Sequence, residues 1–243
     1  MASNALRQRQ GSYARGEDTR RRILQTALEV FAAEGYEGAS TRLLAERAGV
    51  NLPAIQYYFG SKEGLYRAVI ENIVQHNEMH LAPLSLKLKV ALDDPATPKE
   101  RLLDLLCEML ESFVALLSSG GQDDSRRLFY ARAEIECTAG LDFLHKHSSR
   151  QVFDPCLALV ARLLHKSTDD PDCIVRTLML LGQATIFCNR GVRDAIGLNV
   201  EDRLGEICGA LRSSTKAIMR AAMAQAQRHT PTTEPAPEST DAD

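Results

Sequence analysis

The chain has 243 residues, 44% hydrophobic and 25% charged, a composition that excludes a disordered chain and allows one small and one larger folded unit. It contains no run of about 18 apolar residues, which excludes a membrane-spanning helix. Its polar N-terminus lacks the apolar core of an export signal, so we expect a cytoplasmic protein. The net charge of −3 hides an asymmetry, because residues 1–62 carry nine Lys and Arg against six Asp and Glu. A basic end on an acidic body fits an anionic partner at that end, although chance also produces offsets of this size.

Helical periodicity dominates and no convincing strand pattern occurs, so we expect an all-α fold. Residues 1–16 are polar, with three arginines and no acidic residue, and are expected to form a flexible basic arm. Asp18 or Thr19 can cap the first helix, and Gly35 can end it. The next helices are expected at 41–48, 52–59 and 62–81, with caps at Ser40 or Thr41, Asn51 and Ser61 and a break at Pro83.

The second half of the chain predicts a larger helical unit. Asp-Pro pairs and a capping box at Thr97 mark the starts of helices. In each, a capping residue stands just before a proline in the first helical turn. The expected helices span 97–118, 125–137, 141–147, 154–166, 171–195 and 199–227. Residues 228–243 are rich in Pro, Thr and Glu and are expected to be disordered. We therefore expect a small domain at 17–63 and a larger one at 64–227.

Residues 40–59 carry the most informative motif. They predict a short helix, a turn at Gly49 and a second short helix, which is the helix-turn-helix arrangement. Ala45 is small enough to let the helices approach closely, and Gly49 can take a positive φ. The residues expected to face inward are Leu44, Val50, Ile55 and Phe59. The N-terminal part of the second helix is left exposed and can enter a DNA major groove.

This block and its flanks resemble the TetR/AcrR family of bacterial regulators. The resemblance covers about residues 20–65. It comprises the apolar run from Ile23 to Phe31 with Gly35, the segments 41–42, 44–45 and 48–50, and Phe59-x-Ser61-Lys62-Glu63-x-Leu65. It implies an N-terminal helix-turn-helix domain and a larger C-terminal helical domain for ligand binding and dimerisation. It further implies a homodimeric repressor that a small molecule releases from a pseudo-palindromic operator in double-stranded DNA.

The resemblance and the exposed positions of the second helix together predict the DNA-contacting residues. These are Thr41, Arg42, Leu52, Pro53, Gln56, Tyr57, Tyr58 and Lys62. The resemblance makes the second short helix the recognition helix and gives Lys62 a phosphate contact. Gln56 departs from the family, where tyrosine is usual; glutamine can read adenine through two hydrogen bonds, so a relative's operator should not be transferred. A plainer interpretation is also open, with tyrosines that pack the small domain and solvated charges at 42 and 62.

Two further groups of arginines lie near the small domain. One, Arg20 to Arg22, stands at a helix start, where the helix dipole disfavours cations, and so indicates either a phosphate partner or a solvated face. The other lies in the arm and comprises Arg7, Arg9 and Arg15. The arm can reach the duplex as a homeodomain arm does, or it can stay in solvent.

Two predicted helices near the C-terminus are typical of an interface. Residues 172–195 are apolar nearly all round, and such a helix needs partners on every side. In the last helix Leu204, Leu211 and Ile218 repeat at an interval of seven, which favours a seam for another helix. The family resemblance implies that the pair forms a four-helix interface with a second copy of the chain. Packing within one chain is the alternative.

Residues 126–136 mix charged and aromatic residues. Together with 182–183 and 187–190 they resemble the CecR-like C-terminal domain of one TetR subgroup. This resemblance implies a small-molecule pocket among the central helices. The candidate effector-binding residues are Phe129, Arg132, Glu134, Gln183 and Phe187. The alternative is a set of core aromatics and salt-bridged helix charges.

Other chemistries find less support in the sequence. His76 and His80 share a helix face, but two histidines alone do not make a metal site, and we expect no metal or cofactor. The six cysteines stand singly and are expected to be buried thiols rather than redox sensors. No phosphate-binding loop, nucleophile elbow or zinc-protease motif occurs, so we expect no enzyme. Two alternatives stay open. The first is an activator or adaptor whose C-terminal helices bind a protein and no ligand. The second is a helical enzyme with a vestigial N-terminal unit, and the presence of Thr41, Arg42 and Lys62 argues against it.

Overall fold

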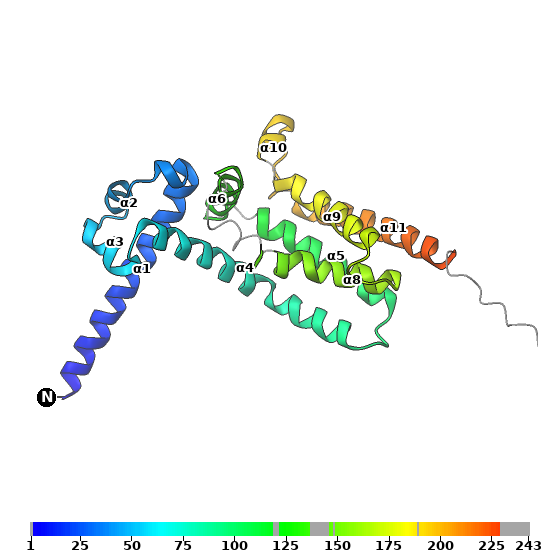
Figure 1. The fold of residues 1–243 in the computed structure, drawn as a ribbon, viewed down its shortest axis with the longest axis horizontal. Coiled ribbons are helices and arrows are strands. Elements are labelled where there is room, and N and C mark those ends of the chain that lie inside the picture. The colour runs from blue at the N-terminus through cyan, green and yellow to red at the C-terminus, as the bar shows by residue number, and fades with distance from the viewer. Residues whose placement is uncertain (1, 119–121, 137–145, 148, 189, 229–243) are drawn as a thin grey trace, which may run out of the picture.

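The computed structural model describes residues 2–118, 122–136, 146–147, 149–188 and 190–228, and in these ranges it contains helices and turns but no strand (Figure 1). The all-α prediction is therefore confirmed. The elements are α1 (Ala2–Gly38), α2 (Thr41–Arg47), α3 (Leu52–Phe59), α4 (Lys62–Asp93), α5 (Lys99–Ser118), α6 (Gln122–Glu136), the π-helical turn η1 (Ser149–Phe153), α8 (Asp154–Leu164), α9 (Pro171–Thr185), the 3-10 turn η2 (Ile186–Cys188), α10 (Arg190–Ile196) and α11 (Leu204–Arg228).

Two hydrophobic cores divide the molecule. The first, which we call the head, is built from α1, α2, α3 and the first half of α4, with buried residues of α6 added to it. The second, the body, is built from the second half of α4 together with α5, α8, α9 and α11. α4 has 32 residues and runs from one core into the other, a length of about 48 Å at 1.5 Å per residue (Figure 1). One continuous helix therefore links head and body.

The predicted break at Pro83 is wrong, because α4 continues through it to Asp93. A proline inside a helix costs roughly 3 kcal/mol through a lost hydrogen bond and a clash with the preceding turn. Pro83 is exposed, so water can reach the carbonyl that loses its partner. On the inner side Leu81, Leu84 and Leu88 are buried in the body core, and their burial, worth about 1.5–3 kcal/mol each, outweighs this cost.

The first helix begins earlier than predicted. α1 starts at Ala2 rather than near Asp18, and its first ten residues contain no proline and are dominated by Ala, Leu, Arg and Gln, which favour helix. Near its other end the helix is kinked at Gly35, where φ is 76° and ψ is 176°. The predicted stop thus falls at the kink, and the chain makes one more turn to Gly38.

The predicted helix at 171–195 also differs from the structure. It divides into α9, η2 and α10, with the change of helix type after Thr185. Gly182 and the β-branched Thr185 both lower the helix propensity here. The Thr185 hydroxyl donates to the Gly182 carbonyl oxygen at 3.2 Å, a local bond that competes with regular helix.

The last helix begins at Leu204 rather than at residue 199. Asn199 folds the preceding segment into a turn, since its Oδ1 accepts the backbone N–H of Glu201 at 3.1 Å and its Nδ2 donates to Asp202 at 2.7 Å. The predicted helices at 97–118, 125–137 and 154–166 agree with α5, α6 and α8 within three residues. The helix expected at 141–147 falls mostly outside the described residues, as does the tail beyond 228. Across the described ranges no helix is long and apolar enough to span a lipid bilayer.

Candidate nucleic-acid interface

Side-chain caps set the starts of α2 and α3. Ser40 Oγ accepts the backbone N–H of Leu43 at 3.1 Å, and Asn51 Oδ1 accepts that of Ala54 at 3.0 Å. Between the helices Gly49 takes a φ of 62°, a conformation that costs other residues roughly 1–2 kcal/mol. The predicted caps at Ser40 and Asn51 and the predicted turn are confirmed, and they produce the helix-turn-helix arrangement.

Buried side chains hold α3 at its angle to α2. Leu44, Ala45 and Ile55 are buried in the head core. Val50 and Phe59 are half-buried and pack against the same core. The inward set predicted from the sequence is confirmed, and it leaves only one side of α3 accessible.

That accessible side of α3 carries four of the predicted contact residues. Tyr57 is 82% exposed and Leu52 is 51% exposed, and Pro53 and Gln56 are exposed beside them. Tyr58 differs, because it is half-buried and packs edge-on against the Tyr57 ring at a centroid distance of 5.0 Å. The amide of Gln56 can read an adenine edge, and apolar groups such as Leu52 can meet a thymine methyl.

Lys62 stands in the first turn of α4. Its ammonium lies 4.4 Å from the centre of the Tyr36 ring, a cation–π contact that holds the charge close to the head. Burial raises the pKa of Tyr36 above its ordinary value of 10.0, and the negative charges of Glu63 and Glu37 add to this, so the ring is neutral at physiological pH. A lysine at a helix start suits a phosphate, which the free N–H groups of that turn also attract.

The first turns of α2 and α4 supply the remaining predicted contacts. Arg42 is exposed and Thr41 is half-buried at the start of α2. Ser61 caps α4, because its Oγ accepts the backbone N–H of Gly64 at 3.0 Å. Each of these helix starts combines free N–H groups with a hydroxyl or a cation, which is the chemistry that binds a DNA phosphate.

Two of the predicted effector-binding residues lie in the contact between α6 and the head. Phe129 is 1% exposed, and its ring centroid lies 5.0 Å from that of Tyr66 in α4. Arg132 donates from Nη2 to the Ala33 carbonyl oxygen of α1 at 2.6 Å and lies 3.9 Å from the Glu136 carboxylate. α6 is therefore docked onto α1 and α4.

The kink at Gly35 receives the end of α6. Glu136 Oε2 accepts the backbone N–H of Tyr36 at 2.9 Å. A Cβ at position 35 would collide with the Glu136 carboxylate, and the φ of 76° also requires glycine. Sequence reasoning missed this link, because nothing in the sequence pairs residues that lie 100 positions apart.

The other predicted effector residues lie elsewhere. Gln183 in α9 accepts a hydrogen bond from the Ser214 hydroxyl of α11 at 2.9 Å, and Phe187 is half-buried against the body core. The side chain of Glu134 is outside the described residues. The structure therefore does not bring the four described candidates into one pocket, and their effector role stays a prediction.

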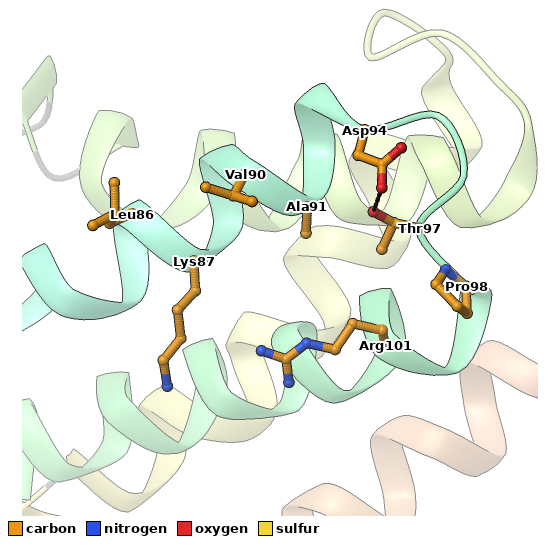
Figure 2. A pocket seen from close by; sticks show the side chains of 8 residues that line it. All are labelled: Leu86, Lys87, Val90, Ala91, Asp94, Thr97, Pro98 and Arg101. Atoms are coloured by element: carbon orange, nitrogen blue, oxygen red, sulfur yellow. Dashed lines mark hydrogen bonds between the residues drawn. The ribbon is translucent and has the colours of Figure 1, made fainter.

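A groove of about 500 Å³ opens at the far end of α4, away from the head. Figure 2 shows its lining, which comprises Leu86, Lys87, Val90, Ala91, Asp94, Thr97, Pro98 and Arg101. Lys87 and Arg101 both pair with Glu108, at 3.4 and 3.2 Å. None of the predicted effector residues lines this groove. The groove includes the turn between α4 and α5, which the sequence analysis identified only as a break between two helices.

The surroundings of the histidine and cysteine candidates are described for part of the chain. Arg126 Nη1 lies 3.4 Å from His76 Nε2, and its positive charge there would repel a metal cation. His80 is exposed. Among the described side chains, no three His, Cys, Asp or Glu gather as a metal site requires. Burial raises the pKa of the Cys107 thiol to about 11 and that of Cys156 to about 12, so these two are the unreactive buried thiols that we expected.

These features define a class of protein. Two short capped helices joined at a glycine turn, with one face of the second helix open to solvent, form a helix-turn-helix unit that binds DNA, here carried on a helical body. Residues 23–69 match the bacterial regulatory proteins of the tetR family, and residues 102–221 match the C-terminal domain of the HTH-type transcriptional dual regulator CecR. The chain belongs to the TetR family of transcriptional regulators, and the resemblance predicted for both parts is confirmed.

Two similar proteins show how far this likeness extends. The HTH-type transcriptional dual regulator CecR of Shigella flexneri is 29% identical over 179 residues, which cover 71% of this chain and 77% of that protein. The tetracycline repressor protein class C of Escherichia coli is 41% identical over 64 residues, which cover 26% of this chain and 29% of that protein. The second likeness is short, whereas the first reaches into the body. Both proteins are transcription regulators and not enzymes, as we predicted for this chain.

Solved structures agree on the fold. A TetR-like transcriptional regulator from Rhodococcus sp. RHA1 superposes with a TM-score of 0.58 at 20% identity, covering 83% of this chain and 96% of that one. HlyIIR, a hemolysin II transcriptional regulator, superposes with a TM-score of 0.52 at 19% identity, covering 81% and 98%. At such low identity this likeness establishes the fold alone.

Proposed function

We propose that this TetR-family regulator is a homodimeric repressor that binds a pseudo-palindromic operator and releases it when a small molecule binds the body. The observation that carries the proposal is the exposed face of α3, where Gln56 and Tyr57 are accessible on a capped helix. The tetracycline repressor protein and the repressor NicS of Pseudomonas putida are named as repressors, and CecR as a dual regulator. An operator-binding role places the protein with its DNA in the cytoplasm.

We divide the DNA contacts into those that read bases and those that hold the backbone. The base-reading set on the exposed side of α3 comprises Leu52, Pro53, Gln56 and Tyr57. The backbone-holding set at the helix ends comprises Thr41, Arg42, Tyr58 and Lys62. Such a division predicts different mutational effects for the two sets.

Replacing Arg42 or Lys62 by alanine is expected to weaken binding to all DNA sequences alike, because a phosphate contact carries no sequence information. Each lost contact should lower the slope of log affinity against log salt concentration by about one unit. Fluorescence anisotropy at several salt concentrations measures this slope. Arg203→Ala is the control, because Arg203 is exposed on the body. Slopes equal to that of the parent would contradict the phosphate role.

Replacing Gln56 by alanine is expected to relax the base preference at one position of each half-site, at a cost of about 1–3 kcal/mol toward the preferred base. Selection of bound sequences from random DNA measures the preference. Gln75→Ala on α4 is a matched control, since Gln75 is an exposed glutamine outside the proposed interface. A binding-site logo unchanged by Gln56→Ala would rule out base reading by this residue.

A second copy of the chain fits the outer face of α9 and α11, which lie side by side in the body (Figure 1). In α9, Leu178 is 55% exposed and Met179 is 58% exposed. The neighbouring outer side of α11 carries a series of small residues at intervals of four, namely Gly205, Gly209, Ser213 and Ala217, all exposed. Large apolar side chains beside small ones let helices of two subunits approach closely. We infer that this face forms the dimer interface.

The seam predicted in α11 does not belong to that interface. Leu211 is buried within the chain, and Leu204 and Ile218 pack against the body core. These contacts support the intrachain alternative for this seam. The proposed dimer therefore depends on α9 and on the small residues of α11.

The ligand response needs a connection from body to head, and two helices provide one. α4 runs through both cores, and α6 is bonded to α1 through Arg132 and Glu136. A ligand that binds one arrangement of these helices more tightly shifts the population toward it. We propose that this shift changes the separation of the two recognition helices and lowers operator affinity.

Selection from random DNA followed by mobility-shift titration with candidate ligands tests the proposed function. The expected result is a two-fold symmetric site with half-sites about 34–36 Å apart, released by a ligand that binds the body. If the protein releases the operator without added ligand, or if its DNA affinity is unchanged at saturating ligand, the proposed response to a ligand is overturned. The alternative, an activator or adaptor that binds a protein through its C-terminal helices, predicts a palindromic site but no ligand response.

A further inference from the structure

We propose that the N-terminal part of α1 is a second DNA-binding element, which contacts phosphates beside the half-site read by α3. The proposal rests on the proposed operator-binding function and extends the interface beyond residues 41–62. α1 begins at Ala2, but its first residue in the head core is Ile23. The residues before Ile23 span about 32 Å at 1.5 Å per residue, and Figure 1 shows the N-terminal end of α1 projecting away from the rest of the chain.

Two contacts set the course of this projecting helix. A Cβ at Gly16 would lie 3.6 Å from the Tyr58 hydroxyl, at the end of α3. The Arg20 guanidinium lies 5.2 Å from the centre of the Phe59 ring, one residue further along α3. Position 9 precedes positions 16 and 20 by seven and eleven residues, a spacing that places all three on one side of a helix. The side of α1 that meets the recognition helix therefore continues past the head.

The charge of this segment suits a polyanion. Residues 1–16 carry Arg7, Arg9 and Arg15 and no acidic residue, whereas residues 63–243 are acidic in balance. A helix that leaves from the end of the recognition helix with only positive charge meets the backbone flanking the bases that α3 reads. A helical arm also loses less conformational entropy on binding than a disordered one, so its contacts add more to the affinity.

The test uses the full chain and the operator selected with it. The parent and the triple variant Arg7→Gln, Arg9→Gln, Arg15→Gln are titrated against a short duplex that ends at the outer edges of the two half-sites, and against one extended by about ten base pairs on each side. Glutamine keeps the helix propensity close to that of arginine. The parent is expected to bind the long duplex at least about tenfold more tightly than the short duplex. The variant is expected to lose this preference and to show a salt slope lower by about two to five units per dimer.

A matched triple variant neutralises three exposed cations of the body, Lys89→Gln, Arg150→Gln and Arg228→Gln, and should keep the parent's preference and slope. Equal affinity of the parent for both duplexes would overturn the arm contact while leaving operator binding by the head intact. Loss of the dimer in the arm variant, measured by light scattering, would assign the arm to a protein contact and also overturn the proposal. A parent without preference for any sequence would reject the proposed function itself.

Discussion

Replacing Leu178 by aspartate is expected to convert the protein into a monomer and to lower operator affinity by about 100-fold or more, which corresponds to about 3 kcal/mol. Leu178 is 55% exposed at the centre of the apolar face of α9, so the change leaves the single chain intact. In the proposed dimer the same position is buried, and an unpaired carboxylate there is strongly destabilising. A monomer can hold only one half-site, which removes the advantage of two linked heads.

Light scattering and mobility-shift titration measure the two effects. Leu86→Asp is the matched control, because Leu86 is an equally exposed helix leucine, 66% exposed, on the far half of α4. It should keep both the dimer and the affinity. Circular dichroism shows whether the variant is folded. If Leu178→Asp unfolds the chain, Leu178 packs within one subunit. If the variant is a folded dimer with the parent's operator affinity, the interface lies elsewhere.

Replacing Phe129 by alanine is expected to destabilise the head by about 3–5 kcal/mol, the usual cost of removing a buried aromatic side chain. Phe129 fills the space between α6 and the Tyr66 ring, so its loss leaves a cavity where α6 docks. DNA binding should weaken, while the dimer that we propose to form through the body should be kept. Chemical denaturation measures the stability, and hydrogen exchange in α1 and α4 locates the change.

The same experiment decides between two roles for this residue. Leu128→Ala is the control, because its neighbour Leu128 is 47% exposed and should cost less than 1 kcal/mol. If Phe129→Ala left stability unchanged but abolished the ligand response, Phe129 would line the effector pocket that the sequence predicted. Loss of stability with retained ligand binding in the body would assign it to the head core.

The head could be predicted closely because its signals are local. Ser40, Asn51 and Ser61 each cap a helix through a hydrogen bond to a backbone N–H three residues later, and the turn at Gly49 needs only the φ of one residue. Such features act within one turn of chain, so sequence spacing describes them fully. The exposed and buried sides of α3 then follow from helical periodicity.

Elsewhere long-range packing overrode the local rules. Pro83 predicted a break, but the buried leucines beside it hold α4 together. The heptad of α11 predicted an intersubunit seam, yet periodicity cannot say whether a helix packs on its own chain or on another. Phe129 and Phe187 both matched a pocket pattern, and the fold placed them against different cores.

The amino-acid order by itself determined the helical class, the capped helix-turn-helix and the side of α3 that stays exposed, because these depend on hydrogen bonds and periodicity within a few residues. Only the tertiary structure decided that α6 locks onto α1 at Gly35 and that α4 runs unbroken between two cores. Such contacts join residues far apart in the chain, and their free energy comes from burial that exists only once the whole chain has folded.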